Sequence, residues 1–125
     1  MRKIQESEVT FTIEAEQDDI PVRGQFASGD DEQDKRDEDE ILRRLDSGDI
    51  WAWASVCVKA TLTMPDGSTA EGRDYLGCCS YANEADFKSD GGYYSGMKIE
   101  ALADLQRELE AEVARGALIA QWFKE

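Results

Sequence analysis

A dense run of carboxylates is the feature of this sequence that most invites a chemical interpretation. Residues 30 to 40 read DDEQDKRDEDE, so eight acidic and two basic side chains give the run a local charge of −6. The acids are Asp30, Asp31, Glu32, Asp34, Asp37, Glu38, Asp39 and Glu40. Carboxylates can act as general acids or bases, chelate a cation or bind a basic surface. Which of these roles fits depends on the other residues of the sequence.

Catalysis is disfavoured by the residue types that the chain lacks. General acid–base chemistry needs a carboxyl group whose pKa is tuned by burial or by a neighbour, whereas acids in a solvated run are screened by water. The sequence has no histidine, which removes the common proton shuttle and the Ser-His and Cys-His nucleophile pairs. It also contains neither a GxSxG nor a GxxxxGK[ST] motif. We therefore expect a protein that is not an enzyme, with no catalytic residues and no cofactor.

Metal binding is disfavoured by spacing. A calcium loop of the EF-hand type that started at Asp30 would need glycine at its sixth position and glutamate at its twelfth, where the chain has Lys35 and Ile41. The three cysteines, Cys57, Cys78 and Cys79, cannot complete a zinc site without histidine, and the adjacent pair does not easily form a disulfide. We expect no metal ligands, and we expect the cysteines to be small strand residues in a reducing cytosol.

The density of charge in the run is similar to that of a nucleic acid. If residues 30 to 40 are helical, their eight carboxylates lie along about 16 Å, or one charge per ~2 Å, against ~1.7 Å in duplex DNA. If they are extended, the interval is about 4.5 Å, closer to that of a single strand. Either surface could occupy the Lys/Arg groove of a nucleic-acid-binding protein. The competing interpretation is a solvated loop in a salt-adapted protein.

The distribution of charge favours the functional interpretation over general salt adaptation. The chain has 28 acidic and 14 basic side chains, and nine of the fourteen excess negative charges fall in residues 1–49. A salt-adapted chain would spread them more evenly. With a pI near 4.3 the protein should be repelled by phosphate backbones and anionic lipids, so we expect a basic protein partner and no direct binding to nucleic acid or membrane.

Two tryptophans next to the acidic run are the other candidate binding residues. Every even-numbered residue from Ile50 to Met64 is apolar, which predicts a strand with one face in the core. Trp51 and Trp53 fall on the opposite face. Either they are buried beneath the C-terminal tail, or they are exposed and anchor a partner, because interface energy concentrates in aromatic residues ringed by polar ones. The second interpretation adds Trp51 and Trp53 to the eight acids as partner-binding residues, with Tyr93-Tyr94 as further apolar contacts.

Strands account for much of the remaining pattern. Alternation from Val9 to Glu16 predicts a first strand, and Pro21 to Phe26 predicts a weaker second strand that pairs back on it. The long strand over residues 50–64 is followed by a tight turn at Pro65-Asp66-Gly67 and by a returning strand over residues 68–81.

Helices are expected in two places. A short apolar stripe from Ile41 to Leu45, ended by Ser47-Gly48-Asp49, predicts a short helix with a very acidic first turn. A long amphipathic helix is expected from Tyr93 to Arg115, with Gly116 as its C-cap. Its apolar stripe is Met97, Ala101, Leu102, Leu105, Leu109 and Val113.

These elements predict an α+β fold. We expect an antiparallel sheet of about four strands with one short and one long helix, in the order ββαββα. A chain of 125 residues buries about two-thirds of its unfolded surface, which is enough for a single domain over residues 1–125. The longest apolar run is far shorter than the roughly 20 residues of a membrane span, and the first residues, MRKIQESE, lack the apolar region of a signal peptide. We expect a cytoplasmic protein.

The C-terminal segment supports an alternative function. After Gly116, four apolar residues form a patch at helical spacing, namely Leu118, Ile119, Trp122 and Phe123. Such a patch fits a small structural or assembly module that oligomerises, including as a homodimer.

The pattern as a whole resembles a class of phage proteins. The resemblance rests on the chain length, on DDEQDKRDEDE and on the segments WAWASVCVKATLTMPDG, DYLGCCSY and GGYYSGMKIEALADL. These features are similar to small acidic accessory proteins of phages and prophages, among them anti-CRISPR and antirestriction proteins, several of which mimic DNA. The resemblance transfers no individual residues. It implies an inhibitor in the bacterial cytoplasm that binds the basic DNA-binding surface of a defence nucleoprotein, with a CRISPR surveillance complex (CRISPR-Cas) as the leading candidate, and blocks access to DNA.

Overall fold

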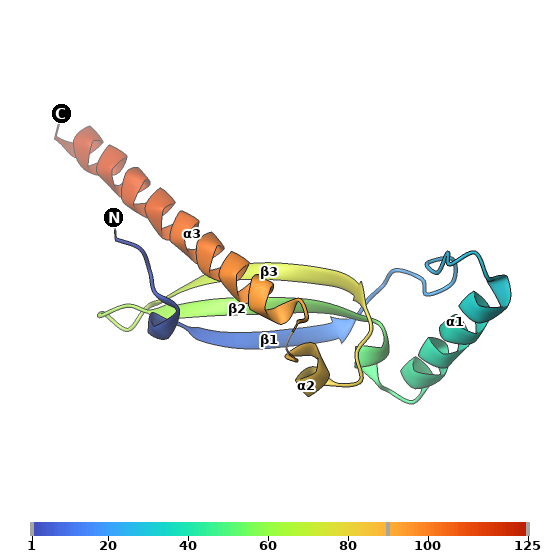
Figure 1. Ribbon diagram of the computed structural model, residues 1–125. Coiled ribbons are helices and arrows are strands. Elements are labelled where there is room, and N and C mark those ends of the chain that lie inside the picture. Colours follow the sequence, from blue (N-terminus) through green and yellow to red (C-terminus); the bar gives the residue numbers. More distant parts are fainter. Residues whose placement is uncertain (1, 90, 125) are drawn as a thin grey trace. The chain divides into compact units, whose positions relative to one another are not determined.

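The protein has an α+β fold built on one antiparallel sheet. The computed structural model describes residues 2–89 and 91–124, and its three strands lie in the order β1-β2-β3 (Figure 1). The strands are β1 (Thr10–Gln17), β2 (Ala54–Thr63) and β3 (Thr69–Cys79). The α-helices are α1 (Asp31–Asp46), α2 (Glu84–Phe87) and α3 (Tyr94–Phe123). The expected α+β class is confirmed, but the sheet has three strands rather than about four, and the order of strands and α-helices is βαββαα rather than ββαββα.

The β2–β3 hairpin forms where the sequence predicts it. Gly67 has φ 87°, a left-handed conformation that glycine adopts without strain. The Met64 amide donates to the Ser68 carbonyl (2.7 Å), and the Asp66 carboxylate accepts from both the amide and the hydroxyl of Ser68. These hydrogen bonds from Ser68 hold the pKa of Asp66 below its usual range. These hydrogen bonds close the turn.

The expected strand over Pro21–Phe26 is wrong, because the backbone of this segment bonds to α1 instead of to a neighbouring strand. The Gly24 amide, in a residue with φ 87°, donates to the Glu38 carboxylate (2.8 Å). The Gln25 amide closes a turn on the Val22 carbonyl (3.3 Å). Val22 itself is buried, so the segment contributes to the core as a loop.

The remaining elements differ from expectation at their ends. Ile50–Ala52 is a 3-10 turn, so β2 begins only at Ala54, and another 3-10 turn at Glu6–Glu8 precedes β1. Helix α1 begins at Asp31 and includes the whole acidic run after its N-cap. Helix α3 continues through Gly116, which is therefore not a C-cap, because one glycine costs a helix only about 1 kcal/mol. The one-turn helix α2 was not expected.

The chain divides into two compact units, and each contains part of the sheet. Unit 1 comprises residues 1–13, 58–74 and 95–125, and unit 2 comprises residues 14–57 and 75–94. Among the helices that the structure describes, none has the length and apolarity needed to cross a membrane.

In unit 1, α3 packs directly on the backbone of β3. A Cβ atom placed on Gly72 would lie 2.3 Å from the Ala101 carbonyl oxygen and 2.3 Å from the Leu105 nitrogen, so only glycine fits at this crossing. Met97, Ala101 and Leu105 are buried there. This confirms the first part of the predicted stripe of the long helix.

In unit 2, the core lies between α1, the loop before it and the start of β2. Val22, Ile41, Ala52 and Trp53 form a buried cluster, with Phe26, Leu42, Leu45 and Cys78 packed around it. The Trp53 indole nitrogen donates to the Ile20 carbonyl (2.8 Å). Phe87 of α2 is fully buried, and its ring contacts those of Trp51, Tyr81 and Tyr94.

Candidate functional site

The acidic run is an ordered helix. Asp30 is the N-cap of α1, and its side chain accepts from the Gln33 amide (3.1 Å). Asp31, Glu32 and Asp34 occupy the first turn, where negative charge interacts favourably with the helix dipole. Part of the acidity therefore has a local structural explanation, and the run is helical rather than extended.

Two of the eight predicted partner-binding acids face into the protein. Asp34 and Glu38 are each only 8% exposed. Asp34 accepts from the hydroxyl of Ser28 (2.7 Å), and Glu38 accepts from the guanidinium of Arg23 (3.2 Å) as well as from Gly24. Buried carboxylates that are hydrogen-bonded in this way hold the loop before α1 in place. They are not part of the acidic surface.

The other six acids remain on the surface, but basic residues partly offset them. Asp30, Asp31, Glu32, Asp39 and Glu40 are exposed, and Asp37 is half-buried. Asp39 pairs with Arg23 (2.5 Å), and Glu40 pairs with Arg43, whose hydrogen bond lowers the pKa of Glu40. The end of α1 that includes Asp31 and Glu32 is therefore the most available part of the acidic surface.

The tryptophans do not form the exposed anchor considered above. Trp53 is 5% exposed and belongs to the unit 2 core, and Trp51 is half-buried against Tyr81 and Phe87. The buried interpretation therefore fits Trp53, although the segments that cover it are α1 and the loop before it rather than the C-terminal tail. Tyr94 also packs on Phe87, whereas Tyr93 is exposed.

Charge is divided unequally between the units. Unit 2 has 17 acidic and six basic side chains in its sequence, a net charge of −11, whereas unit 1 has 11 acidic and eight basic side chains, a net charge of −3. Exposed acids in unit 2 outside α1 include Glu14, Glu16, Asp19 and Glu84. The acidic surface is thus a property of unit 2 as a whole and is not confined to the run in α1.

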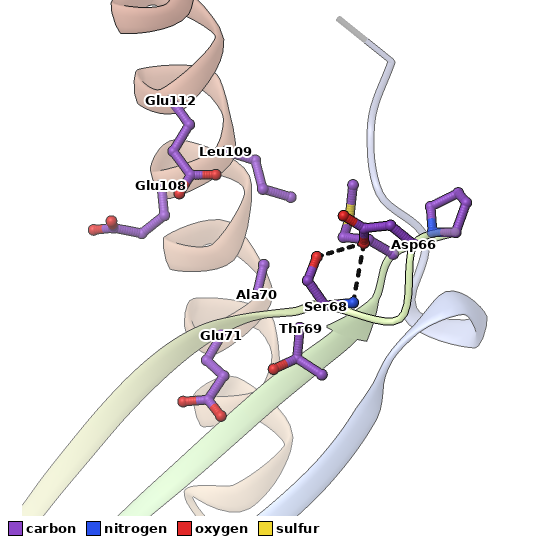
Figure 2. Close-up of a pocket in the computed structure, with 10 residues that line it drawn as sticks. Asp66, Ser68, Thr69, Ala70, Glu71, Glu108, Leu109 and Glu112 are labelled. Carbon is purple, nitrogen blue, oxygen red and sulfur yellow. Dashed lines mark hydrogen bonds between the residues drawn. The ribbon is translucent and has the colours of Figure 1, made fainter.

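Unit 1 contains an open hollow of about 890 Å³ between the β2–β3 turn and α3. Its lining includes four carboxylates and several apolar side chains: Met64, Pro65, Asp66, Ser68, Thr69, Ala70, Glu71, Glu108, Leu109 and Glu112. Figure 2 shows Leu109 pointing from α3 toward the hairpin turn, with Glu108 and Glu112 on the same stretch of helix. Glu71 of this lining already pairs with Arg73 (2.5 Å) and Lys59 (3.8 Å), so the negative charge of the hollow is partly offset.

The C-terminal part of α3 is a second exposed feature of unit 1. Leu109 is buried, but every described residue from 110 to 124 is exposed. Val113, Leu118, Trp122 and Phe123 are each more than 60% exposed, and Ile119 is 44% exposed. The predicted apolar patch therefore lies on a helix that the protein itself does not cover.

The cysteines lie in unit 2 and have the character of structural thiols. Cys57 and Cys79 are buried, and the Cys79 thiol donates to the Ala54 carbonyl (3.2 Å). Burial raises the pKa of both Cys78 and Cys79, so these thiols stay protonated at neutral pH. Over residues 2–89 and 91–124, no group of three or more cysteine, aspartate or glutamate side chains is arranged to hold a metal ion.

Sequence reasoning missed two features. Asp18 bridges the end of β1 to β3 by accepting from the amides of Ile20 (2.9 Å) and Cys78 (2.8 Å), and these bonds lower its pKa. The acidic hollow was also missed. Glu108 and Glu112 stand one helical turn apart, which signals a shared face, but nothing in the sequence places Asp66 and Glu71 beside that face.

Comparison of the chain with known protein families, curated proteins and solved structures finds no match.

Proposed function

We propose that the protein is a non-catalytic inhibitor that uses the acidic surface of unit 2 to occupy the basic, nucleic-acid-binding surface of a partner protein. The observation that carries this proposal is the net charge of −11 on unit 2, with six acids of the 30–40 run on the surface of the ordered helix α1 and its N-cap. The resemblance to phage inhibitors makes a bacterial defence nucleoprotein, such as a CRISPR surveillance complex, the first partner to test.

Because the acidic run is already folded as the helix α1, it is suited to this mode of binding. An acidic segment that is disordered when free must lose conformational entropy on binding, and this weakens the complex. In α1 that entropy is already lost, because the N-cap Asp30 and the buried Asp34 and Glu38 hold the helix and its preceding loop. The two inward-facing acids therefore contribute indirectly, by presenting the outward-facing ones.

The interaction must be collective and sensitive to salt. A single exposed ion pair contributes about 0.2–1 kcal/mol, so tight binding needs many such pairs. Long-range attraction between an acidic unit and a basic groove accelerates association and is screened by salt. A complex of this kind should dissociate at high ionic strength and should compete with DNA for the same surface.

The test compares two variants with the same net charge. In the first, Asp31→Lys and Glu32→Lys reverse two exposed charges of unit 2. In the matched control, Glu100→Lys and Glu110→Lys reverse two exposed charges of unit 1. Both changes move the formal net charge from −14 to −10. Proteins retained from bacterial lysate at low salt and released at high salt are identified by mass spectrometry, and DNA binding by the purified partner is then titrated with each variant.

We expect the wild-type protein and the control to inhibit DNA binding similarly, and the unit 2 variant to inhibit at least about tenfold less well. Equal inhibition by the two variants would show that net charge alone, and not the surface of α1, matters. Failure to retain any nucleic-acid-binding protein, or retention that salt does not disturb, would contradict the proposal.

A further inference from the structure

A second hollow in unit 1, which we call the α3 slot, lies between the N-terminal segment and α3. Its volume is about 390 Å³. It is lined by Lys3, Ile4, Ile99, Leu102, Ala103, Gln106 and Arg107. All seven residues belong to unit 1, so the slot is formed within one compact unit. It shares no lining residue with the acidic hollow beside Leu109.

Hydrogen bonds from Gln106 hold the wall of the slot that the N-terminal segment supplies. The Gln106 Oε1 atom accepts from the Ile4 amide (2.9 Å), and its Nε2 atom donates to the Arg2 carbonyl (3.2 Å). Ile4 is buried. The segment is fixed to α3 a second time by the ion pair of Lys98 with Glu6 (3.4 Å). The slot is therefore already formed in the folded chain before any ligand binds.

Four of the seven lining side chains are aliphatic, and two of these are open to solvent. Ile99 is 66% exposed and Leu102 is half-buried. Ligand sites are typically hollows of about 300–1,000 Å³ with mostly apolar walls and few polar groups. At roughly 30 Å³ per water molecule, the slot has the volume of about 13 waters. This size suits a small molecule, whereas a protein partner needs about 800 Å² of surface on each side.

The charge of the slot is opposite to that of the protein as a whole. The chain has 28 acidic and 14 basic side chains, yet the described residues that line the slot include two cations, Lys3 and Arg107, and no carboxylate. Arg107 pairs with Asp104 (3.6 Å), but its side chain stays exposed, and Asp104 also accepts from the Arg73 amide (2.9 Å). A guanidinium has five N–H donors, so Arg107 can bind a second anion.

We propose that the α3 slot binds a small aliphatic carboxylate, with its hydrocarbon chain against Ile99 and Leu102 and its carboxylate at Lys3 and Arg107. Ammonium and guanidinium groups form charge-assisted hydrogen bonds with carboxylates. The lining side chains include no aromatic ring on which a flat ligand could stack, so a hydrocarbon chain fits the walls better. Lys3 and Arg107 come from different segments, so the ligand joins the N-terminal segment to α3. The proposal does not depend on the acidic surface of unit 2.

The first test follows the amide resonances of the isotope-labelled full-length protein during titration with octanoate. We expect saturable shifts, largest at the residues that line the slot, with a dissociation constant below about 1 mM. Butyrate is four methylenes shorter and should bind at least about tenfold more weakly, since each buried methylene contributes about a factor of four. Octylammonium has the same chain as octanoate with the opposite charge and should also bind the slot at least about tenfold more weakly.

Two outcomes of this titration would overturn the proposal. One is the lack of saturable shifts at the slot up to about 10 mM octanoate. The other is equal binding of octanoate and octylammonium at the slot, which would mean that Lys3 and Arg107 do not select an anion.

The second test uses two variants of equal net charge. Lys3→Gln with Arg107→Gln removes both cations of the slot, and Arg115→Gln with Lys124→Gln removes two exposed cations near the C-terminal end of α3. Both changes move the formal net charge from −14 to −16. We expect the slot variant to raise the dissociation constant of octanoate at least about tenfold and the control to change it less than about twofold. Similar weakening in both variants would mean that octanoate responds to net charge alone, against the proposal.

A dilution series without ligand tests whether a second copy of the chain occupies the slot instead. The resonances of Ile99, Leu102 and Ala103 should stay in place between about 50 μM and 1 mM protein. Shifts of these resonances with protein concentration would identify a second copy as the occupant and overturn the proposal. Circular dichroism melts of each variant check that its fold is intact.

Discussion

The two units differ in what they leave exposed. Unit 2 leaves charge exposed, with 17 acidic and six basic side chains, and buries Trp53 and Phe87, although Tyr75 and Tyr93 are exposed. Unit 1 is nearly balanced in charge but leaves an apolar helix uncovered, including Trp122. An exposed charged surface is stable in water without a partner, whereas an exposed apolar helix is not. The comparison separates the proposed partner-binding surface of unit 2 from the apolar side chains that unit 1 exposes at the end of α3.

The largest predicted difference between the two units is in the stability effect of replacing one tryptophan in each. Trp53→Ala should lower the free energy of unfolding by about 3–5 kcal/mol, because the buried ring and its hydrogen bond to Ile20 are both lost. Trp122→Ala, at a residue 72% exposed, should change it by less than about 0.5 kcal/mol in dilute protein. Urea denaturation of both variants checks this. Similar losses at both sites would mean that Trp122 is covered in the monomer.

Two glycines test how closely α3 packs on β3 in unit 1. Gly72→Ala should lower the free energy of unfolding by about 1–3 kcal/mol, because the methyl group has no space between β3 and the backbone of α3. Gly96→Ala is the matched control, since Gly96 lies near the start of α3 in open space. It should stabilise the protein by about 0.5–1 kcal/mol. If Gly72→Ala is neutral in thermal and urea melts, α3 does not cross β3 at this residue.

The smallest effect concerns pH and compares a carboxylate of each unit. Hydrogen bonds from Ile20 and Cys78 lower the pKa of Asp18 in unit 2, and the guanidinium of Arg2 lowers that of Glu8 in unit 1 to about 2. A carboxyl whose folded pKa is depressed contributes stability above its unfolded pKa and loses it as pH falls toward the folded value. Both groups should therefore weaken the fold below about pH 4.

Asp18→Asn tests the part of this pH dependence that comes from unit 2. The variant should be less stable than the wild type at pH 7 and should approach it as the pH falls to 3, because an amide resembles the protonated acid. Melting temperatures between pH 3 and 7 measure the difference, with Asp19→Asn, at an exposed neighbour, as the control. A constant difference across this range would mean that the charge of Asp18 contributes nothing.

Much of the secondary structure was predictable because it depends on local pattern. The alternation in β1, the turn at Gly67 and the stripe from Met97 to Leu109 all appear where the sequence places them. Strand and helix periodicities follow from backbone geometry, so a short window of sequence contains the information. The expected strand over Pro21–Phe26 was wrong because the backbone amide of Gly24 bonds to Glu38, 14 residues away.

The candidate sites were only partly predictable, because the burial of a side chain depends on segments that are distant in the sequence. Composition alone identified the acidic run and the apolar C-terminal patch as unusual. It did not show that Asp34 and Glu38 face inward, because that depends on how the preceding loop packs against α1. It also did not show that Trp53 is buried, because this residue precedes β2 and is covered by α1 and the loop before it, which lie elsewhere in the sequence.

By itself, the sequence determined the α+β class, the apolar stripe of α3 from Met97 to Leu109, the hairpin and the large excess of acidic side chains. Each of these is a property of local order or of composition. Only the tertiary structure decided which acids reach the surface, that four carboxylates line one hollow beside Leu109, and that α3 continues past Gly116 with its side chains exposed. The physical reason is that exposure depends on which distant segments pack against a side chain, and packing between distant segments is not a local property of the chain.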